Sequence, residues 1–272
     1  MRIAGILTAV LVLSLAVAGM VSAQGPPPTV TVTTNGTTLT VTPGGTLAPG
    51  QTRFEFVRAG GGQPELFVAA LRAGVTIDQF TAALRADPEG GKALELAYLD
   101  GGASLDAALP RRFATFALRA NTTYVAMNIE GENPSGWEFT TFTVGGTPNG
   151  AAAPSADATV NFVDLRFTGD RTLPRNGTIR FRNRGWAPHF ALAAPVRAGV
   201  SSSQVGRALR SGSDRTMGRA LDFQRVIEPQ ALITRGADVV NEVRFPRAGR
   251  YALICFFEGH AAQGMYRVVR VR

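Results

Sequence analysis

The chain has 272 residues and a net charge of +8; 45% of its residues are hydrophobic, 18% are charged, and its mean hydropathy is +0.06. These values indicate one large or two modest globular domains and exclude a polytopic membrane protein. With one cysteine and two histidines, the chain cannot build an internal disulfide framework, a zinc-finger array or a centre that needs many imidazoles.

The first 23 residues have the pattern of a secretory signal peptide. Arg2 is followed by an apolar run as far as Val21, and small residues precede a polar, proline-rich segment. This order predicts that residues 1–23 are cleaved and that the mature chain starts near Gln24. The alternative is an uncleaved anchor, because the run is long enough to span a bilayer. We therefore expect a periplasmic or extracellular protein without stable membrane insertion after cleavage.

Alternating β-branched residues predict strands through most of the remaining chain. The first pair, residues 29–34 and 37–42, flanks Asn35-Gly36, a strong signal for a hairpin turn. Short strands punctuated by glycine and proline favour an all-β protein. The other predicted strands are residues 53–57, 115–118, 124–129, 159–167, 178–183, 239–245, 251–256 and 266–271.

Two similar segments with helical spacing interrupt this pattern. Residues 72–85 read RAGVTIDQFTAALR, and residues 197–210 read RAGVSSSQVGRALR. We expect short helices over residues 77–84 and 203–209, each preceded by a Thr or Ser that can cap it. The match predicts an internal duplication, with a short helical insertion in each of two tandem β-sandwiches.

A small, uncharged segment at residues 146–156 is expected to link two domains, residues 24–145 and 157–272. Residues 24–150 carry 8 basic and 11 acidic side chains, whereas residues 151–272 carry 19 and 9. The positive C-terminal half favours an acidic partner; alternatively, its arginines form an ordinary solvated surface. Nucleic acid is not expected as a partner, because the chain is expected to be exported and has neither a basic run nor an aromatic–basic motif.

The segment with the most chemical information is residues 251–265, YALICFFEGHAAQGM. It holds the single cysteine, Cys255, followed by His260 and Met265, while the second histidine, His189, lies upstream. One thiolate, two imidazoles and one thioether form the ligand set of a blue-copper centre. Three of these residues on one loop, and the fourth at a neighbouring strand end, can converge at one pole of a β-sandwich. The alternatives are ordinary core and turn residues, or a zinc site, which rarely recruits methionine.

The C-terminal half resembles the cupredoxins, the family of plastocyanin, azurin, auracyanin and rusticyanin. The resemblance covers about residues 156–272 and rests on Asn183, on His189 and on the Cys-x4-His-x4-Met loop, which is closest to the auracyanin and rusticyanin type. It implies a Greek-key β-sandwich with one copper per chain that cycles between Cu(II) and Cu(I). The implied equatorial ligands are His189, Cys255 and His260, and the implied axial ligand is Met265. Phe190 departs from the family, which often has Asn or Ser at this position.

The N-terminal half contains neither histidine nor cysteine. It is therefore expected to be a degenerate cupredoxin-like domain without metal ligands. In the repeat, Glu65 and Asn128 take the places of the first histidine and the cysteine, and Trp137 or Glu138 takes that of the methionine.

Taken together, the sequence predicts an exported electron carrier with a protein redox partner, and not an enzyme. Nucleophile-elbow, zinc-protease and P-loop motifs are absent, and two histidines cannot also build the second copper site of a nitrite reductase. Two alternatives remain. The chain could be a metal-free binding or structural module, or it could use the same ligands to store or deliver copper.

Overall fold

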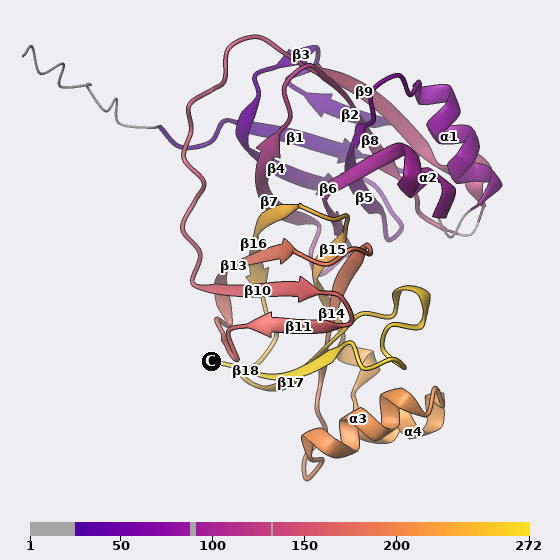
Figure 1. The fold of residues 1–272 in the computed structure, drawn as a ribbon, viewed down its shortest axis with the longest axis vertical. Coiled ribbons are helices and arrows are strands. Elements are labelled where there is room, and N and C mark those ends of the chain that lie inside the picture. Colours follow the sequence, from indigo (N-terminus) through magenta and orange to yellow (C-terminus); the bar gives the residue numbers. More distant parts are fainter. Residues whose placement is uncertain (1–24, 88–90, 132) are drawn as a thin grey trace, which may run out of the picture.

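The computed structural model describes residues 25–87, 91–131 and 133–272 (Figure 1). The predicted signal peptide, residues 1–23, lies outside the described residues. Strands make up most of the regular structure in both halves of the chain, and a short helical insertion interrupts the strands of each half. The prediction of an all-β protein with two helical insertions is confirmed.

Within the described residues, both halves follow the same order of five strands, two helices, three strands, a 3-10 turn and a last strand. The N-terminal elements are β1 (Thr29–Thr34), β2 (Leu39–Thr42), β3 (Thr46–Leu47), β4 (Gly50–Arg58), β5 (Glu65–Leu71), α1 (Ile77–Ala86), α2 (Gly91–Leu96), β6 (Ala97–Ser104), β7 (Arg111–Leu118), β8 (Thr122–Asn128), a 3-10 turn (Pro134–Gly136) and β9 (Glu138–Val144).

The C-terminal half adds one further 3-10 turn to this order. Its elements are β10 (Ala158–Val163), β11 (Arg166–Gly169), β12 (Thr172–Leu173), β13 (Asn176–Asn183), β14 (His189–Pro195), α3 (Ser202–Arg210), α4 (Asp214–Ala220), a 3-10 turn (Phe223–Arg225), β15 (Ile227–Ile233), β16 (Asp238–Arg244), β17 (Gly249–Ile254), a 3-10 turn (Phe257–Gly259) and β18 (Tyr266–Val271). The shared order agrees with a duplication, which itself stays a prediction.

Each half has a five-stranded sheet of its own, and the two halves share an eight-stranded sheet. The shared sheet has the order β11-β10-β13-β16-β7-β4-β1-β2, and the other two are β3-β9-β8-β5-β6 and β12-β18-β17-β14-β15. The halves join where β7 pairs with β16, with Thr115 opposite Val240 and Ala114 opposite Asn241. Sequence patterns predicted two sandwiches but not this joint, because strand pairing across it is independent of side-chain periodicity.

Both helical insertions begin with the same local device. The Thr76 hydroxyl accepts a hydrogen bond from the backbone N–H of Gln79, whose side chain accepts one from the Thr76 N–H, and Ser201 and Gln204 repeat this capping box at the start of α3. Reciprocal capping satisfies backbone donors that a helix start leaves unpaired. Both helices therefore begin where the sequence predicted.

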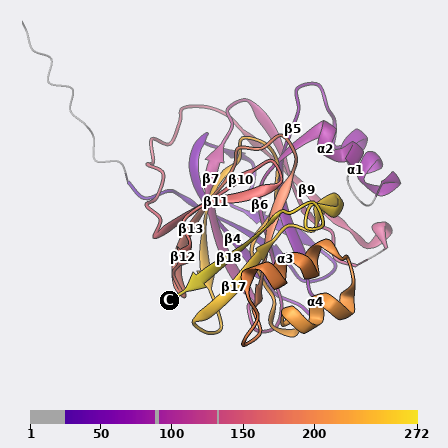
Figure 2. The same cartoon turned by 60° about the horizontal axis from the view of Figure 1, so that its bottom comes forward.

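The helices cover the outer faces of the five-stranded sheets (Figures 1 and 2). Phe80 and Leu84 of α1 pack in one apolar cluster with Phe67 of β5, and Leu209 of α3 packs in another with Ile254 of β17. The inner faces of the same sheets line the core between the layers. Strands in this position are covered on both sides.

This double coverage helps to explain why sequence patterns missed β5 and β14. Every residue of β5 after Glu65 is buried, so its sequence is apolar throughout and lacks the alternation of a half-exposed strand. The same holds for the last residues of β14. One predicted strand, residues 159–167, is instead the pair β10 and β11, because the chain turns back at Asp164, whose φ is 49°.

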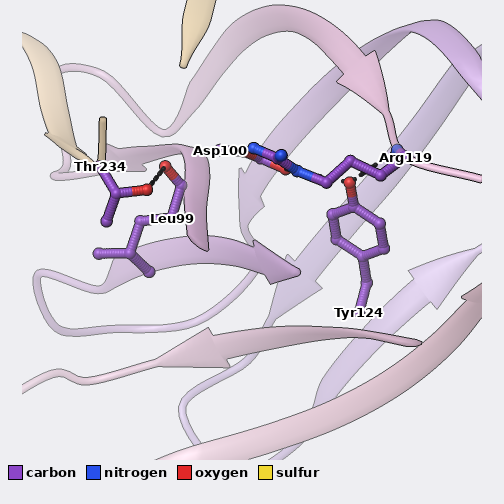
Figure 3. Close-up of polar contacts among 5 residues, drawn as sticks. All are labelled: Leu99, Asp100, Arg119, Tyr124 and Thr234. Atoms are coloured by element: carbon purple, nitrogen blue, oxygen red, sulfur yellow. Dashed lines mark hydrogen bonds and ion pairs between the residues drawn. The ribbon is translucent and has the colours of Figure 1, made fainter. Parts of the chain in front are cut away.

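A buried polar group lies beside a second contact between the halves (Figure 3). The backbone N–H of Thr234, just after β15, donates to the carbonyl of Leu99 in β6 at 3.0 Å. The next residue, Asp100, accepts two hydrogen bonds from the Arg119 guanidinium at 2.8 and 3.2 Å and one from the Tyr124 hydroxyl at 3.0 Å. These hydrogen bonds of Asp100 hold β6 in place, and β6 in turn contacts the end of β15.

Replacing Asp100 with Ala should lower the free energy of unfolding by about 2–3 kcal/mol, because the buried Tyr124 hydroxyl and the Arg119 guanidinium lose their shared acceptor. Urea denaturation measures the loss. The matched control is Arg111→Ala, which removes a solvent-exposed ion pair with Glu55 and should cost less than about 1 kcal/mol. Equal losses in the two variants would contradict a structural role for the Asp100 group.

Candidate metal centre

Two histidines and the single cysteine meet at one end of the C-terminal half. His189 is the first residue of β14, Cys255 follows β17, and His260 follows the 3-10 turn at Phe257–Gly259. All three side chains are buried, and each offers a ligand atom that lies within 4.8 Å of the other two. Within the described part of the chain, this is the one such group of three potential metal ligands. The structure therefore brings together three of the four predicted site residues.

The distances between the donor atoms suit one metal ion. The Cys255 sulfur lies 3.6 Å from Nδ1 of His260 and 3.9 Å from Nδ1 of His189. An ion about 2.0 Å from nitrogen and about 2.3 Å from sulfur separates these ligand atoms by about 3.5–3.7 Å at tetrahedral to trigonal angles, close to both distances. A thiolate with two imidazoles is the equatorial set of a type 1 copper site. The buried group fits this type of site, with one copper per chain.

Met265 closes the loop that carries two of these residues. Its side chain is fully buried in the same core cluster as Cys255. Its backbone N–H donates to the His260 carbonyl at 2.9 Å, and its carbonyl accepts from the Cys255 N–H at 3.2 Å. Gly259 and Gly264 have φ values of 75° and 109°, which only glycine adopts without strain. The loop thus places Met265 beside the site, while metal binding through its sulfur stays a prediction.

Asn183 ties the approach to His189 to the rest of the half. Its side-chain amide donates to the carbonyls of Ala187 at 2.8 Å and Ile233 at 3.0 Å, and its side-chain oxygen accepts from the backbone N–H of Gly185 at 3.0 Å. Asn183 is 2% exposed, so these bonds form away from water. They hold the segment before His189 against the end of β15.

Two phenylalanines flank the imidazoles. The Phe257 ring packs edge-on to His260, with ring centroids 5.7 Å apart, and the Phe162 ring lies 5.8 Å from His189. The two imidazole centroids are 5.0 Å apart. Phe257 lies inside the motif, so its proximity could have been expected. Phe162 comes from β10, and no sequence signal connects it with the site.

Burial favours the uncharged forms of His189 and Cys255 in the metal-free chain. Burial lowers the pKa of His189 to about 4. The neighbouring His260 lowers this pKa further, whereas the negative charge of Asp164 raises it. Burial also raises the pKa of the Cys255 thiol to about 11. Hydrogen bonds from the backbone N–H groups of Phe190 and Phe257 lower this pKa and offset part of the rise. A bound cation reverses the preference of the thiol, because thiolate and not thiol is the metal ligand.

Strand pairing corrects one expected counterpart in the N-terminal half. Ile254, next to the cysteine, pairs with Leu192, whereas Met127, next to Asn128, pairs with Phe67. Counting back from these pairs, the residue that corresponds to His189 is Pro64 and not Glu65. The expected pair, Glu65 with His189, is therefore one residue out of register. In a strand, a shift of one residue moves a side chain to the opposite face.

The place of the soft ligands in the N-terminal half is taken by hydrogen-bonded polar side chains. Asn128, at the position of the cysteine, pairs in the sheet with Glu138, which corresponds to the methionine. One Glu138 oxygen accepts from the Asn128 amide at 2.9 Å and from the Thr34 hydroxyl at 2.7 Å. This half also contains neither histidine nor cysteine. It therefore lacks the thiolate and imidazole donors of a type 1 copper site.

Comparisons with known proteins add a likeness of fold. No family model and no curated protein matches the chain. Among solved structures, auracyanin A from Chloroflexus aurantiacus is 20% identical, with 42% of this chain and 96% of that chain covered and a TM-score of 0.28. Reduced auracyanin from Roseiflexus castenholzii is 18% identical over 43% and 99%, with a TM-score of 0.28. A copper-containing nitrite reductase from Thermus scotoductus is 12% identical over 90% and 61%, with a TM-score of 0.24. Likeness at these scores carries no functional conclusion, which has to come from the site itself.

Lowering the pH should destabilise the metal-free protein more than a His189→Gln variant. The pKa of His189 is about 4 in the folded chain against an ordinary value of 6.5. The unfolded state therefore takes up the proton first, and stability is lost as the pH falls from 6.5 towards 4. The wild type should lose about 2 kcal/mol more than the variant between pH 7 and pH 4.5. Urea unfolding with a chelator at both pH values measures this, and parallel losses would show that His189 does not resist protonation.

Proposed function

We propose that this chain is an exported blue copper protein that carries single electrons through one mononuclear type 1 copper site. The observation that carries the proposal is the convergence of two imidazole nitrogens on one buried sulfur, at 3.6 and 3.9 Å. One thiolate and two imidazoles are donors that suit copper. A single soft cation can bind all three, because the distances between their donor atoms match those around one metal ion.

The proposed equatorial ligands are His189, Cys255 and His260, and the proposed axial ligand is Met265. The burial of Met265 and its two backbone hydrogen bonds within the loop support the axial assignment. Thioether sulfur also favours copper over zinc, which usually binds nitrogen, thiolate and carboxylate ligands.

Copper, when bound, supplies one-electron chemistry by cycling between Cu(II) and Cu(I). The residues of the chain contribute the surroundings. Phe162 and Phe257 pack against the two imidazoles, and the buried position of the site excludes water. Asn183 and the short backbone bonds of the ligand loop resist movement. A site that moves little when its charge changes suits fast electron transfer, because less reorganisation is needed.

Export and an acidic protein partner belong to the same proposal. The apolar N-terminal segment supports export, and the single cysteine is free and buried, as expected if it serves a metal and not a disulfide. Among the described residues, none of the helices is long and apolar enough to cross a membrane. The excess of basic side chains in residues 151–272 supports a negatively charged redox partner. Both histidines belong to the proposed site, which leaves none for a second, catalytic copper centre of the kind found in nitrite reductases.

Copper-loaded protein should show an intense visible band from charge transfer between the Cys255 thiolate and Cu(II). Cys255→Ser should abolish this band, because the hydroxyl is a much poorer donor than the thiolate. The matched control is Ser211→Ala in the exposed helical insertion, which should keep it. A colourless protein with full copper loading would rule out the type 1 site. Loss of copper on reduction would instead favour storage or delivery, and failure to bind copper at all would favour a metal-free module.

Met265→Leu should keep the visible band but raise the reduction potential. Removing a sulfur donor favours the ion with the lower charge, Cu(I), and the axial ligand is a known determinant of the potential. We expect a rise of at least about 60 mV, which corresponds to one tenfold change in a one-electron equilibrium. Met127→Leu, a buried methionine in the N-terminal half, is the matched control for cyclic voltammetry. Unchanged potentials in both variants would remove Met265 from the ligand set.

A further inference from the structure

A hollow of about 500 Å³ lies between the two halves, next to the proposed copper site. Trp186, Arg235 and Phe257 line it from the C-terminal half, and Arg72 and Tyr98 line it from the N-terminal half. Ligand sites of small molecules have volumes of about 300–1,000 Å³ and often form where domains meet. Because residues of the N-terminal half line one side of the hollow, it suits a small molecule better than the flat face of a folded partner.

The hollow exposes an aromatic ring that the fold does not need. Trp186 is 67% exposed, and within the described chain the other exposed large hydrophobic residue is Val226. Tyr98 lines the same space from the opposite wall. The exposed Trp186 indole provides a stacking surface for an aromatic ligand, whereas the Tyr98 ring is already covered by the guanidinium groups of Arg72 and Arg119.

The charges of the lining favour an anion. Arg72 and Arg235 face the hollow from different halves, with Glu95 as the acidic residue of the lining. Neither arginine takes part in the ion pairs found among the described residues. The Arg72 guanidinium lies 4.4 Å from the centre of the Tyr98 ring, a cation–π contact that fixes its position. A carboxylate in the hollow can pair with either guanidinium.

A single ring connects the hollow with the metal centre. Phe257 lines the hollow and packs edge-on to His260, with a centroid separation of 5.7 Å. A molecule bound there lies one side chain away from a proposed copper ligand.

We propose that the hollow binds a small aromatic molecule with one anionic group, stacked on Trp186 and held by Arg235 and Arg72. This site goes beyond the proposed function, because its binding needs no metal. If the copper proposal is correct, the bound molecule occupies the approach to His260 from the N-terminal half.

The probe for this site is 4-fluorocinnamate, whose binding to metal-free protein is followed by ¹⁹F NMR. Its methyl ester keeps the ring and removes the charge. Trp186→Ala and Arg235→Gln should each weaken binding of the acid by about tenfold, as expected for losing one stacked ring or one charge-assisted hydrogen bond. The ester should bind the wild type about tenfold more weakly than the acid, for the same electrostatic reason.

Two further variants serve as controls. Arg207→Gln removes an exposed arginine of α3 and should bind the acid as the wild type does, and so should Cys255→Ser, because the site does not depend on copper. Equal affinity for acid and ester, or unchanged affinity in both Trp186→Ala and Arg235→Gln, would overturn the proposal. The copper proposal is tested separately by the visible band without the probe, so that the failure of one can be told from the failure of the other.

Discussion

The site depends on one physical constraint, the burial of a thiol that faces two imidazoles. In water each group would be solvated, but here Cys255, His189 and His260 are at most 3% exposed. Burial favours the uncharged forms of Cys255 and His189 in the metal-free chain, because it raises the pKa of the thiol and lowers that of the imidazole. A bound cation favours this arrangement, because thiolate and neutral imidazole are the forms that ligate metals. The neighbouring packing has to hold the three groups in place before the ion arrives.

Much of that packing comes from the joint between the halves. The β7–β16 pair makes one sheet of both halves, and the hydrogen bond from Thr234 to Leu99 brings the end of β15 against β6. His189 pairs with Ile233 at the same end of β15, while Asn183 bonds to the Ile233 carbonyl. The N-terminal half, which contains neither histidine nor cysteine, thus supports the strand next to the proposed site and supplies one wall of the hollow.

The sequence was informative where a local pattern has a local consequence. The capping residues before the two helices predicted the helix starts to within one residue, and alternating residues predicted many of the strands. The spacing of Cys255, His260 and Met265 within one loop allowed a metal site to be predicted before their arrangement was known. Patterns failed for β5 and β14, because strands covered on both faces have no alternation to detect.

What the sequence by itself determined is the inventory: two histidines, one cysteine, their loop spacing and the contrast in soft ligands between the halves. The tertiary structure alone decided that His189 approaches within 3.9 Å of a sulfur 66 residues away, that the halves share a sheet, and that Trp186 and Arg72 line one hollow. Residue types and short spacings are properties of the chain itself. Long-range distances depend on which strand edges pair and which faces are buried, and these depend on the packing of the whole molecule.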